Sequence, residues 1–366
     1  MSAFYCPVHV ITGADCVKNN ASVFTEFGDT ALIVTGNSSA NNGSLADVEE
    51  TLGKNGQGYV LFGGVPANPG IDCVRRGAAL ARECGADFVI AIGGGSPMDA
   101  AKAIALLARQ NIPDKELFSG RYTSDVLPMI HIPTTAGTGS EVTQYAILTD
   151  DVRESKTSIA SPYIFPQYAF LDGKYMLTLG RNTTVNTAVD ALSHAVEGML
   201  SVKAGEISDL LAAGAAGIIC GMFGKFSDGT LTPDDRNRLL YAATLAGMVI
   251  ANTGTTAVHA MGYSLTYYKH IDHGRANGLL LGALMRYCEK KLPHRAGFAL
   301  RACGFKSAEE FSAALASLLG KRESLTDEEC AKYAKKAMAA SNIANCAYSP
   351  AGADLYEMLK SSLGTK

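Results

Sequence analysis

Short runs of β-branched and other apolar residues alternate with helical patterns through the first half of the chain. A run of this kind, bounded by Gly or Pro, is typical of a strand that is buried on both faces of a sheet. The five predicted strands are residues Val8–Thr12, Ala31–Thr35, Tyr59–Phe62, Phe88–Ile92 and Met129–Ile132. Strands that alternate with helices need crossover connections, so we expect a largely parallel sheet with helices on both faces.

Two of the intervening helices have clear ends. Apolar residues at helical spacing predict a helix over Asp72–Cys84, and Gly85 is expected to end it in a conformation that glycine tolerates. A second helix is predicted over Pro97–Arg109, with Ser96 as its N-cap and Pro97 at the first helical position. The first half is therefore expected to fold as repeated strand–helix units.

After about Asp172 the pattern changes to long stretches rich in Ala, Leu and Met, and no convincing strand interrupts them. The predicted helices are residues Val185–Leu200, Ser208–Phe223, Asp234–Ala251, Asn277–Lys290, Ala308–Leu319 and Asp327–Ser341. We therefore expect an α/β N-terminal domain with a parallel, Rossmann-like sheet over residues 1–178. An all-α C-terminal domain should follow over residues 179–366.

Composition and charge narrow the classes of protein. The 366 residues contain 32 Lys and Arg against 35 Asp and Glu, which gives a net charge of −3, and no basic run is present. Nothing therefore indicates a nucleic-acid partner. The longest nearly uncharged stretch, Leu210–Met222, is shorter than the roughly 20 residues that a membrane-spanning helix needs, so we expect no membrane partner.

The N-terminal sequence and the cysteines both favour a reducing compartment. Met1–Val10 has neither the charged region nor the long apolar region of a signal peptide. The nine cysteines are spread from Cys6 to Cys346 without a CxxC pair, and their odd number argues against a disulfide framework. We expect a cytoplasmic protein whose cysteines are small buried residues rather than zinc ligands.

A glycine turn connects the fourth predicted strand to the following helix. Its residues are Gly93, Gly94, Gly95 and Ser96, and Asp99 follows in the first helical turn. Glycines let the backbone approach a ligand closely, and the N–H groups at a helix N-terminus favour an anion such as a phosphate. The motif is not the common GxGxxG fingerprint, so a tight turn without a ligand is the alternative. Asp99 either orients a polar ligand group or interacts with the helix dipole.

A second polar turn follows the next strand, at residues 132–141, and is dense in Gly, Thr and Ser. Its hydroxyl-bearing candidates are Thr134, Thr135 and Thr138. The carboxyl ends of neighbouring parallel strands are where an α/β sheet binds nucleotides. The two turns together therefore predict a nucleotide-binding site.

Four candidate metal ligands lie in the helical half. Asp190 and His194 are four residues apart on one helix face, and His259 and His273 follow further along the chain. One carboxylate and three imidazoles suit Fe²⁺ or Zn²⁺ rather than Ca²⁺ or Mg²⁺. An ordinary helical ion pair of Asp190 with His194 is the alternative. Apolar neighbours indicate burial, and buried polar groups need partners, which favours a ligand set.

These residues occur in motifs whose order and spacing resemble the iron-containing (group III) alcohol dehydrogenases. The resemblance extends from Pro7 to about Tyr287 and depends on residues 93–102 (GGGSPMDAAK), 133–143 (PTTAGTGSEVT), 190–197 (DALSHAVE) and 273–277 (HGRAN). It implies that the glycine turns bind a nicotinamide dinucleotide. It also implies that Asp190, His194, His259 and His273 hold a catalytic divalent metal, with His259 and His273 counted as catalytic residues.

The resemblance implies further cofactor contacts at positions that match the family's motifs. These are Asn68, Thr134, Thr138, Thr143, Ile147 and Lys156. Each has a structural alternative, for example Asn68 as a turn residue, Ile147 as a core residue and Lys156 as a solvated charge. A homodimer is also implied, with the strand Val8–Thr12 pairing across it.

The function that the resemblance implies is a reversible NAD(P)-linked oxidoreductase that interconverts a small alcohol and its aldehyde or ketone. A related polyol dehydrogenase or an enzyme of the dehydroquinate synthase type is the alternative. A non-catalytic nucleotide-binding protein is disfavoured, because all four ligands are present. Tyr263 stands where the family often has a histidine near the substrate, which argues against a histidine proton relay there, and His270 or solvent is the alternative.

The turn after the second strand departs from the family's usual pattern. Gly36 stands where the family often has Asp, and Asn37, Ser38 and Ser39 follow it. A carboxylate at this place accepts hydrogen bonds from the ribose 2′-OH and repels a 2′-phosphate. Without it, backbone N–H groups and hydroxyls can hold the phosphate, so we expect NADP(H), with NAD(H) as the alternative.

Overall fold

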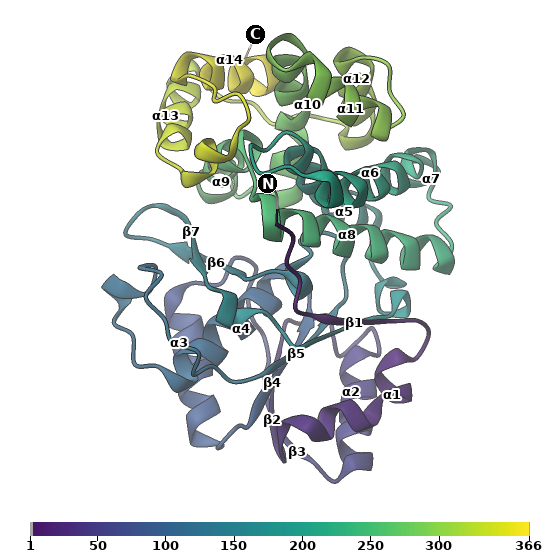
Figure 1. The fold of residues 1–366 in the computed structure, drawn as a ribbon, viewed down its shortest axis with the longest axis vertical. Coiled ribbons are helices and arrows are strands. Elements are labelled where there is room, and N and C mark those ends of the chain that lie inside the picture. The colour runs from purple at the N-terminus through teal and green to yellow at the C-terminus, as the bar shows by residue number, and fades with distance from the viewer. Residues whose placement is uncertain (1–2, 366) are drawn as a thin grey trace. The chain divides into compact units, whose positions relative to one another are not determined.

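A computed structural model describes residues 3–365, which form two compact units (Figure 1). The first, here called the α/β unit, contains residues 6–179 together with 236–240. The second, here called the helical unit, contains residues 180–235 and the described residues of 241–366 and 1–5. The expected fold class, an α/β part followed by a helical part, is confirmed.

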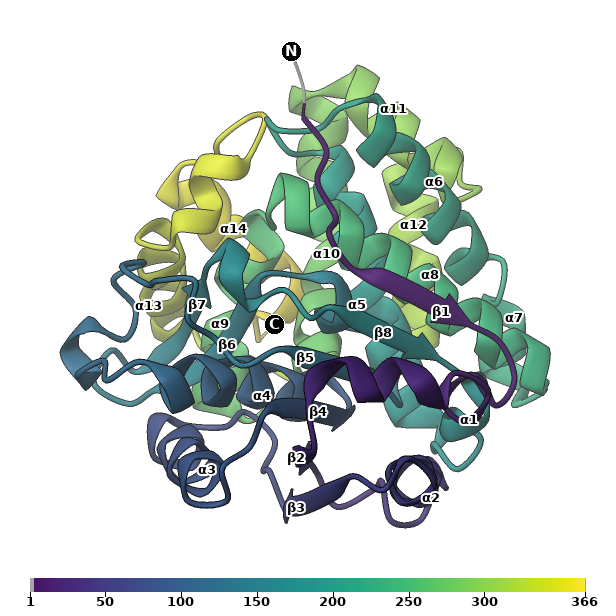
Figure 2. The same ribbon diagram turned by 60° about the horizontal axis from the view of Figure 1, so that its bottom comes forward.

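Six parallel strands form the sheet of the α/β unit, in the order β1-β8-β5-β4-β2-β3 (Figure 2). They are β1 (His9–Thr12), β2 (Thr30–Thr35), β3 (Gly58–Phe62), β4 (Phe88–Gly93), β5 (Met129–Pro133) and β8 (Tyr168–Leu171). The five predicted strands are confirmed to within one residue at each end, and β8 is an addition. Strand β1 lies at one end of the order, so it has a single partner, β8, within the described chain.

A separate antiparallel hairpin, β6 (Tyr145–Asp150) with β7 (Ser155–Ala160), follows the second polar turn. The sequence did not predict it, because burial alternates along β6 and β7 is only partly buried, so neither strand gives a continuous apolar run. The hairpin packs against α4 (Gly95–Arg109) rather than extending the main sheet.

The two faces of the sheet have separate cores. Along β2, Leu32 and Val34 pack with α3 (Ile71–Glu83) and α4, whereas Ala31 and Ile33 pack with α1 (Cys16–Asn19) and α2 (Ser44–Asn55). Alternate side chains of a strand point to opposite faces, so an all-apolar strand such as β2 needs helices on both sides. This arrangement leaves the carboxyl ends of β2, β4 and β5 to carry the polar turns.

The predicted helix ends are partly right. Gly85 adopts the left-handed conformation (φ 63°) just after α3, as predicted. The prediction of Ser96 as N-cap is wrong, because α4 begins at Gly95 and Gly94 is the extended residue before it. Ser96 therefore lies in the first helical turn, and its Oγ accepts a hydrogen bond from the backbone N–H of Asn68.

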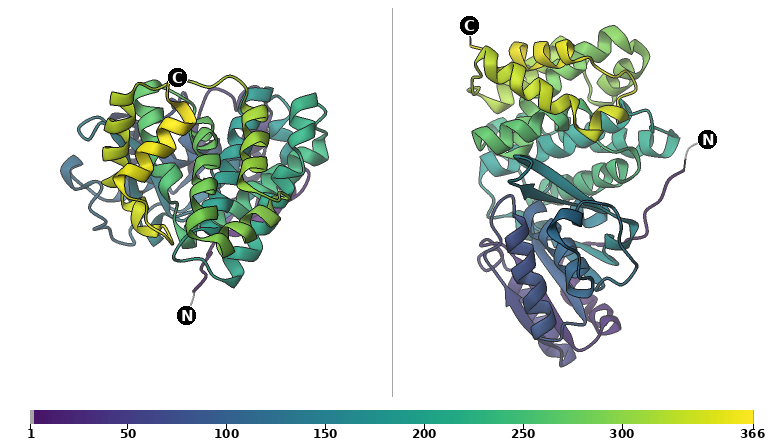
Figure 3. Two further views of the ribbon diagram at one scale, coloured as in Figure 1. Left: turned by 90° about the horizontal axis from the view of Figure 1, so that it is seen from above. Right: turned by 90° about the vertical axis from the view of Figure 1, so that its left-hand side faces the viewer.

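Ten helices fill the described helical region (Figure 3). They are α5 (Arg181–Met199), α6 (Glu206–Cys220), α7 (Phe223–Asp228), α8 (Pro233–Thr253), α9 (Ala257–Lys269), α10 (His273–Lys291), α11 (Pro293–Ala302), α12 (Ala308–Leu319), α13 (Asp327–Met338) and α14 (Gly352–Leu363). The six predicted helices are present, whereas α7, α9, α11 and α14 were not predicted. Short 3₁₀ helices connect the elements at η1 (Ala21–Phe27), η2 (Asp114–Glu116), η3 (Ser140–Val142), η4 (Pro162–Ile164), η5 (Gly173–Met176) and η6 (Ser341–Asn345).

Helix α10 packs against α5, α9 and α12. Two glycines allow its close approach to α5: a Cβ on Gly274 would lie 2.0 Å from the backbone oxygen of Asn186, and one on Gly278 would lie 2.4 Å from Val189 Cγ1. The short separation brings the start of α10 directly beside the middle of α5, where Asp190 lies.

One stretch of the described chain, Glu206–Asp228, is long and apolar enough to cross a membrane by composition alone. It comprises α6 and α7, and a single stretch of this kind is a weak indication, because core helices pass the same test.

Candidate metal centre and dinucleotide site

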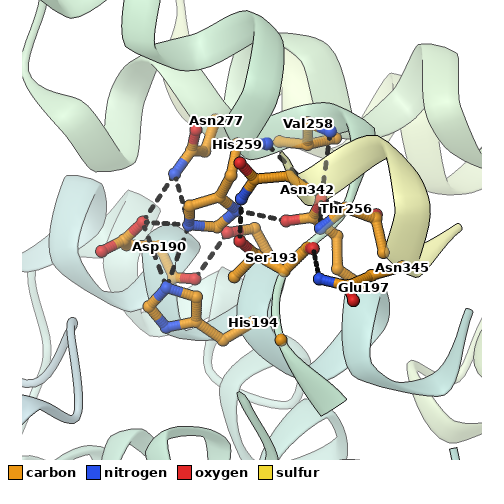
Figure 4. A network of polar contacts seen from close by, with 12 residues as sticks. Asp190, Ser193, His194, Glu197, Thr256, Val258, His259, Asn277, Asn342 and Asn345 are labelled. Atoms are coloured by element: carbon orange, nitrogen blue, oxygen red, sulfur yellow. Dashed lines mark hydrogen bonds and ion pairs between the residues drawn. The ribbon is translucent and has the colours of Figure 1, made fainter. Parts of the chain in front are cut away.

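The four predicted metal ligands lie close together in the helical unit, and Figure 4 shows three of them, Asp190, His194 and His259. Asp190, His259 and His273 form a group whose ligand atoms all lie within 4.8 Å of one another. Asp190 Oδ1 lies 3.9 Å from Nε2 of both His259 and His273, and 4.0 Å from Nε2 of His194. The Nε2 atoms of His194 and His259 are 3.0 Å apart. Metal–ligand bonds of about 2.1 Å place tetrahedral ligand atoms roughly 3.4 Å apart. The separations and the donor chemistry therefore fit one divalent cation.

Three of these side chains are almost fully buried, while the fourth is partly open. Asp190, His194 and His259 are 2–4% exposed, and the side chain of His273 is 23% exposed. Catalytic metal sites keep one coordination position open, whereas structural sites are closed. Among the four predicted ligands, His273 is the most exposed to solvent.

A second carboxylate, Glu197, fixes the orientation of His259 (Figure 4). Glu197 Oε2 accepts a hydrogen bond from His259 Nδ1, and Oε1 accepts from the backbone N–H and the hydroxyl of Thr256 at 2.8 and 2.7 Å. With its proton on Nδ1, the imidazole of His259 presents a lone pair on Nε2. Glu197 was not among the predicted site residues, although it lies in the motif that contains Asp190.

Asn277, one turn into α10, contacts the same group of atoms. Its Nδ2 lies 2.9 Å from Asp190 Oδ1, 3.1 Å from His259 Nε2 and 3.3 Å from His273 Nε2. Its Oδ1 is buried without a hydrogen-bond partner among the described residues. Asp190 Oδ1 and the Nε2 atoms of His259 and His273 therefore all lie close to the Asn277 amide nitrogen. A metal cation would bind these same three atoms.

The charges of the two carboxylates support this assignment. Burial raises the pKa of Asp190, but the facing histidines and the Asn277 amide outweigh that effect and lower it to about 2. Burial likewise raises the pKa of Glu197, and His259 with the Thr256 bonds outweighs it, so that the net shift is downward. Both groups are therefore anionic at neutral pH, with a total charge that a divalent cation would balance.

Tyr263 lies one helical turn after His259 on α9. Its ring stacks on His273, with centroids 5.9 Å apart and an interplanar angle of 10°, and meets the His259 ring edge-on at 6.4 Å. At this position the chain supplies an aromatic surface beside the predicted ligands. His270 is exposed at the end of α9.

The two polar turns of the α/β unit pack directly against each other. A Cβ on Gly94 would lie 3.0 Å from Thr135 Oγ1, and one on Gly95 would lie 2.5 Å from Thr138 Cγ2. Gly93 has φ 146°, and the backbone N–H of Thr134 donates to its oxygen at 2.9 Å. The close approach of the turns therefore favours glycine at these positions, most strongly at Gly93 and Gly95.

The turn after β2 lies next to the first glycine turn. A Cβ on Gly36 would be 3.5 Å from Pro97 Cγ, which is ordinary contact. Asn37 and Ser38 are exposed, whereas Ser39 is buried and its Oγ accepts a hydrogen bond from Thr35 Oγ1 at 2.7 Å. Asn37 and Ser38 thus present polar groups to solvent, and Ser39 contributes to the interior of the turn.

The remaining predicted contacts surround the second turn. Asn68 is exposed, has φ 55°, and accepts from Thr149 Oγ1 through its backbone oxygen at 2.8 Å. Thr143 is buried. Burial raises the pKa of Asp99, and the positive charges of Lys102 and of Lys156 on β7 offset this only in part. The backbone N–H of Ile147 donates to Asp99 Oδ2 at 3.1 Å.

Lys102 on α4 was not among the predicted site residues, and its side chain is fully buried. Its Nζ donates to Ser140 Oγ, Thr143 Oγ1 and the backbone oxygen of Tyr145. A lysine within the otherwise apolar stretch 100–108 was the available signal, because a buried ammonium group needs several acceptors.

A parallel sheet with glycine turns and a helical unit with three histidines around a carboxylate define a metal-dependent dinucleotide oxidoreductase. Residues 7–173 match the model of the iron-containing alcohol dehydrogenase family, and residues 184–363 match that of its C-terminal part. The chain belongs to the iron-containing alcohol dehydrogenase family and is an oxidoreductase.

Individual relatives agree with this assignment. Lactaldehyde reductase of Escherichia coli is 35% identical over 260 residues, which cover 70% of this chain and 68% of that protein. A crystal structure of an iron-containing alcohol dehydrogenase from Thermotoga maritima has a TM-score of 0.92 at 37% identity and covers 99% of both chains. Sulfoacetaldehyde reductase from Bifidobacterium kashiwanohense in complex with NAD⁺ has a TM-score of 0.90 at 26% identity, over 100% of both chains.

The geometry around Glu197 gives a first testable prediction. Glu197→Gln removes the carboxylate that orients His259 and should lower metal affinity about 10- to 100-fold while leaving the fold intact. Competition with a chelator of known affinity measures the change, and circular dichroism checks the fold. Glu206→Gln, at an exposed position of α6, is the matched control. Unchanged metal affinity in Glu197→Gln would contradict the role given to this carboxylate.

Proposed function

We propose that this chain is a reversible NAD(P)-dependent alcohol dehydrogenase for a small, partly apolar alcohol or its aldehyde or ketone. The convergence of Asp190, His194, His259 and His273 around one point carries the proposal. The two glycine turns at the carboxyl ends of β4 and β5 supply the dinucleotide site. The lactaldehyde reductase and alcohol dehydrogenase relatives support a small substrate of this class.

The proposed metal is Fe²⁺ or Zn²⁺, because three imidazoles with one carboxylate suit these ions. When bound, such an ion supplies Lewis-acid chemistry that stabilises the alkoxide form of an alcohol. Asp190 contributes a negative charge, and Glu197 keeps Nε2 of His259 available. The Tyr263 ring beside His273 provides an apolar surface for the carbon part of the substrate.

Removing a ligand should separate the metal function from the dinucleotide function. We expect His259→Ala and His273→Ala to lose bound metal and aldehyde-dependent oxidation of NAD(P)H, because each removes one of four converging ligands. Dinucleotide affinity should stay within about threefold, since the glycine turns belong to the α/β unit. Metal analysis, absorbance of the reduced nicotinamide with short aldehydes, and fluorescence titration measure the three properties.

Two controls complete this test. His294→Ala changes a histidine outside the ligand set and should keep metal and turnover. Glycerol and sugar phosphates replace the aldehydes to examine the polyol dehydrogenase alternative. Full activity in either ligand variant would refute the four-ligand assignment, whereas activity with glycerol alone would change the substrate class.

We further propose that NADP(H) is used at least as well as NAD(H), because Gly36 brings no carboxylate to the turn after β2. Gly36→Asp should weaken NADPH binding by about 1–3 kcal/mol, or roughly 5- to 150-fold, through repulsion of the 2′-phosphate. The space around a Cβ at Gly36 allows the substitution, so the fold should be retained. Gly36→Ala is the neutral control. A tenfold or greater preference of the unmodified protein for NADH would overturn this proposal.

A homodimer through the outer edge of β1 is also proposed. The N–H groups of His9 and Gly13 point to β8, so that of Val10 points to the open edge. Light scattering should give twice the chain mass of 38.4 kDa. Val10→Pro removes the outward donor and should give a monomer, whereas Val10→Ala should not. A monomeric unmodified protein would contradict this interface.

A cytoplasmic location is proposed as well, because all nine cysteines are free thiols in the structure.

A further inference from the structure

Lys102 connects the first glycine turn to the second. It lies on α4, the helix that begins at the first turn, and its Nζ lies 2.8 Å from Ser140 Oγ, 3.0 Å from Thr143 Oγ1 and 2.8 Å from the backbone oxygen of Tyr145. These acceptors belong to η3 and β6, which continue directly from the second turn. An ammonium group has three N–H donors, so all of them are used here.

Asp99, three residues earlier on α4, completes a chain of hydrogen bonds. Ser140 Oγ accepts from Lys102 and donates its own proton to Asp99 Oδ1 at 2.6 Å. Asp99 Oδ2 accepts from the backbone N–H of Ile147 at 3.1 Å. This order of donors and acceptors fits a protonated Lys102 and an ionised Asp99. Thr143 and Ile147, two of the predicted cofactor contacts, take part in this series of hydrogen bonds.

The charged groups around Lys102 come from each neighbouring element. Asp99 on α4 and Glu141 on η3 are negative and favour its protonated form. His131 on β5 is fully buried, and neither ring nitrogen has a hydrogen-bond partner among the described residues. Burial, with Lys102 nearby, lowers the pKa of His131 well below its usual value, so it adds no charge. Lys156 on β7 faces Asp99.

We propose that Lys102 is a positioning residue for the dinucleotide, whose protonated ammonium group holds the second polar turn in its binding shape. Loss of that proton leaves two N–H donors for three acceptors and removes the positive charge, so Lys102 holds the turn less strongly. Dinucleotide affinity should therefore depend on the protonation of Lys102. The inference rests on the proposed dinucleotide function.

The direction of the pH effect follows from burial. Burial lowers the pKa of Lys102, and Asp99 and Glu141 offset this only in part, so that its pKa lies at about 8 instead of 10.5. Below pH 8 the ammonium form is present and affinity is full. Above pH 8 the site loses its proton, and affinity should fall, by at most about tenfold per pH unit for a single proton.

Folding stability should change in the opposite direction. Between pH 8 and 10.5 the unfolded chain keeps the proton of Lys102 and the folded chain does not, so this residue makes the folded state more stable as pH rises. A weaker affinity at high pH that came from unfolding would instead accompany lower stability. Melting temperature and affinity measured together distinguish the two causes.

The experiment is a fluorescence titration of NADPH into the full-length protein at pH 7, 8, 9 and 9.5, with a thermal melt at each pH. For the unmodified protein we expect the dissociation constant to rise about threefold or more from pH 7 to pH 9. Lys102→Met, which keeps the chain length and removes the charge, should bind about fivefold or more weakly at pH 7 and show no further loss. Lys54→Met, at an exposed position of α2, should keep the pH dependence of the unmodified protein.

Each outcome decides the proposal. A dissociation constant that is flat between pH 7 and pH 9 in the unmodified protein overturns it, as does a Lys102→Met protein with unchanged affinity and slope. Lys102→Gln, whose amide keeps two N–H donors, replaces Lys102→Met if the latter does not fold, and the same weak, flat binding is expected. Absence of NADPH and NADH binding at every pH would instead overturn the proposed dinucleotide function, and this inference with it.

Discussion

The desolvation of two carboxylates is the constraint on which the helical unit depends. Asp190 and Glu197 are buried on one helix among apolar neighbours, at a cost that only specific partners can offset. Glu197 has such partners in His259 and Thr256. Asp190 has the Asn277 amide and three imidazole Nε2 atoms within 4.0 Å, an arrangement that gains most from a cation. The partners on α10 reach Asp190 because this helix approaches α5 closely, which is possible because Gly274 and Gly278 carry no side chain.

A similar constraint acts in the α/β unit, where two turns approach each other instead of two helices. A Cβ on Gly95 would lie 2.5 Å from Thr138 Cγ2, which leaves no room for it, and one on Gly94 would be in tight contact with Thr135 at 3.0 Å. A buried lysine then joins the second turn to the helix that begins at the first. The glycines permit the close approach of the turns, and the lysine donates hydrogen bonds to residues that follow the second turn. The proposed dinucleotide site thus depends on the same few residues as the packing of the turns.

Two residues near the proposed sites have simple physical roles in the structure. Tyr263 stacks on His273, so an aromatic surface lies beside the predicted ligands. Gly36 brings no side chain to the turn after β2, where a Cβ would lie 3.5 Å from Pro97 Cγ. The fold around both residues is the one that the iron-containing alcohol dehydrogenase of Thermotoga maritima has.

The sequence alone determined the elements whose patterns are local. Apolar runs located five strands of the main sheet, helical periodicity located α3, α4 and six helices of the second half, and motif spacing selected the four candidate ligands. Tertiary structure decided what depends on partners distant in the sequence. The hairpin β6–β7 and strand β8 are defined by their pairing with other strands. Ser96 lies inside α4 because the helix begins within the glycine turn, at Gly95. Glu197 and Lys102 form hydrogen bonds with residues 38 to 62 positions away in the sequence. Contacts of this kind produce no periodic pattern of apolar and polar residues in the sequence. A hydrogen bond between distant residues depends on how the elements pack and not on the residues next to it in the chain.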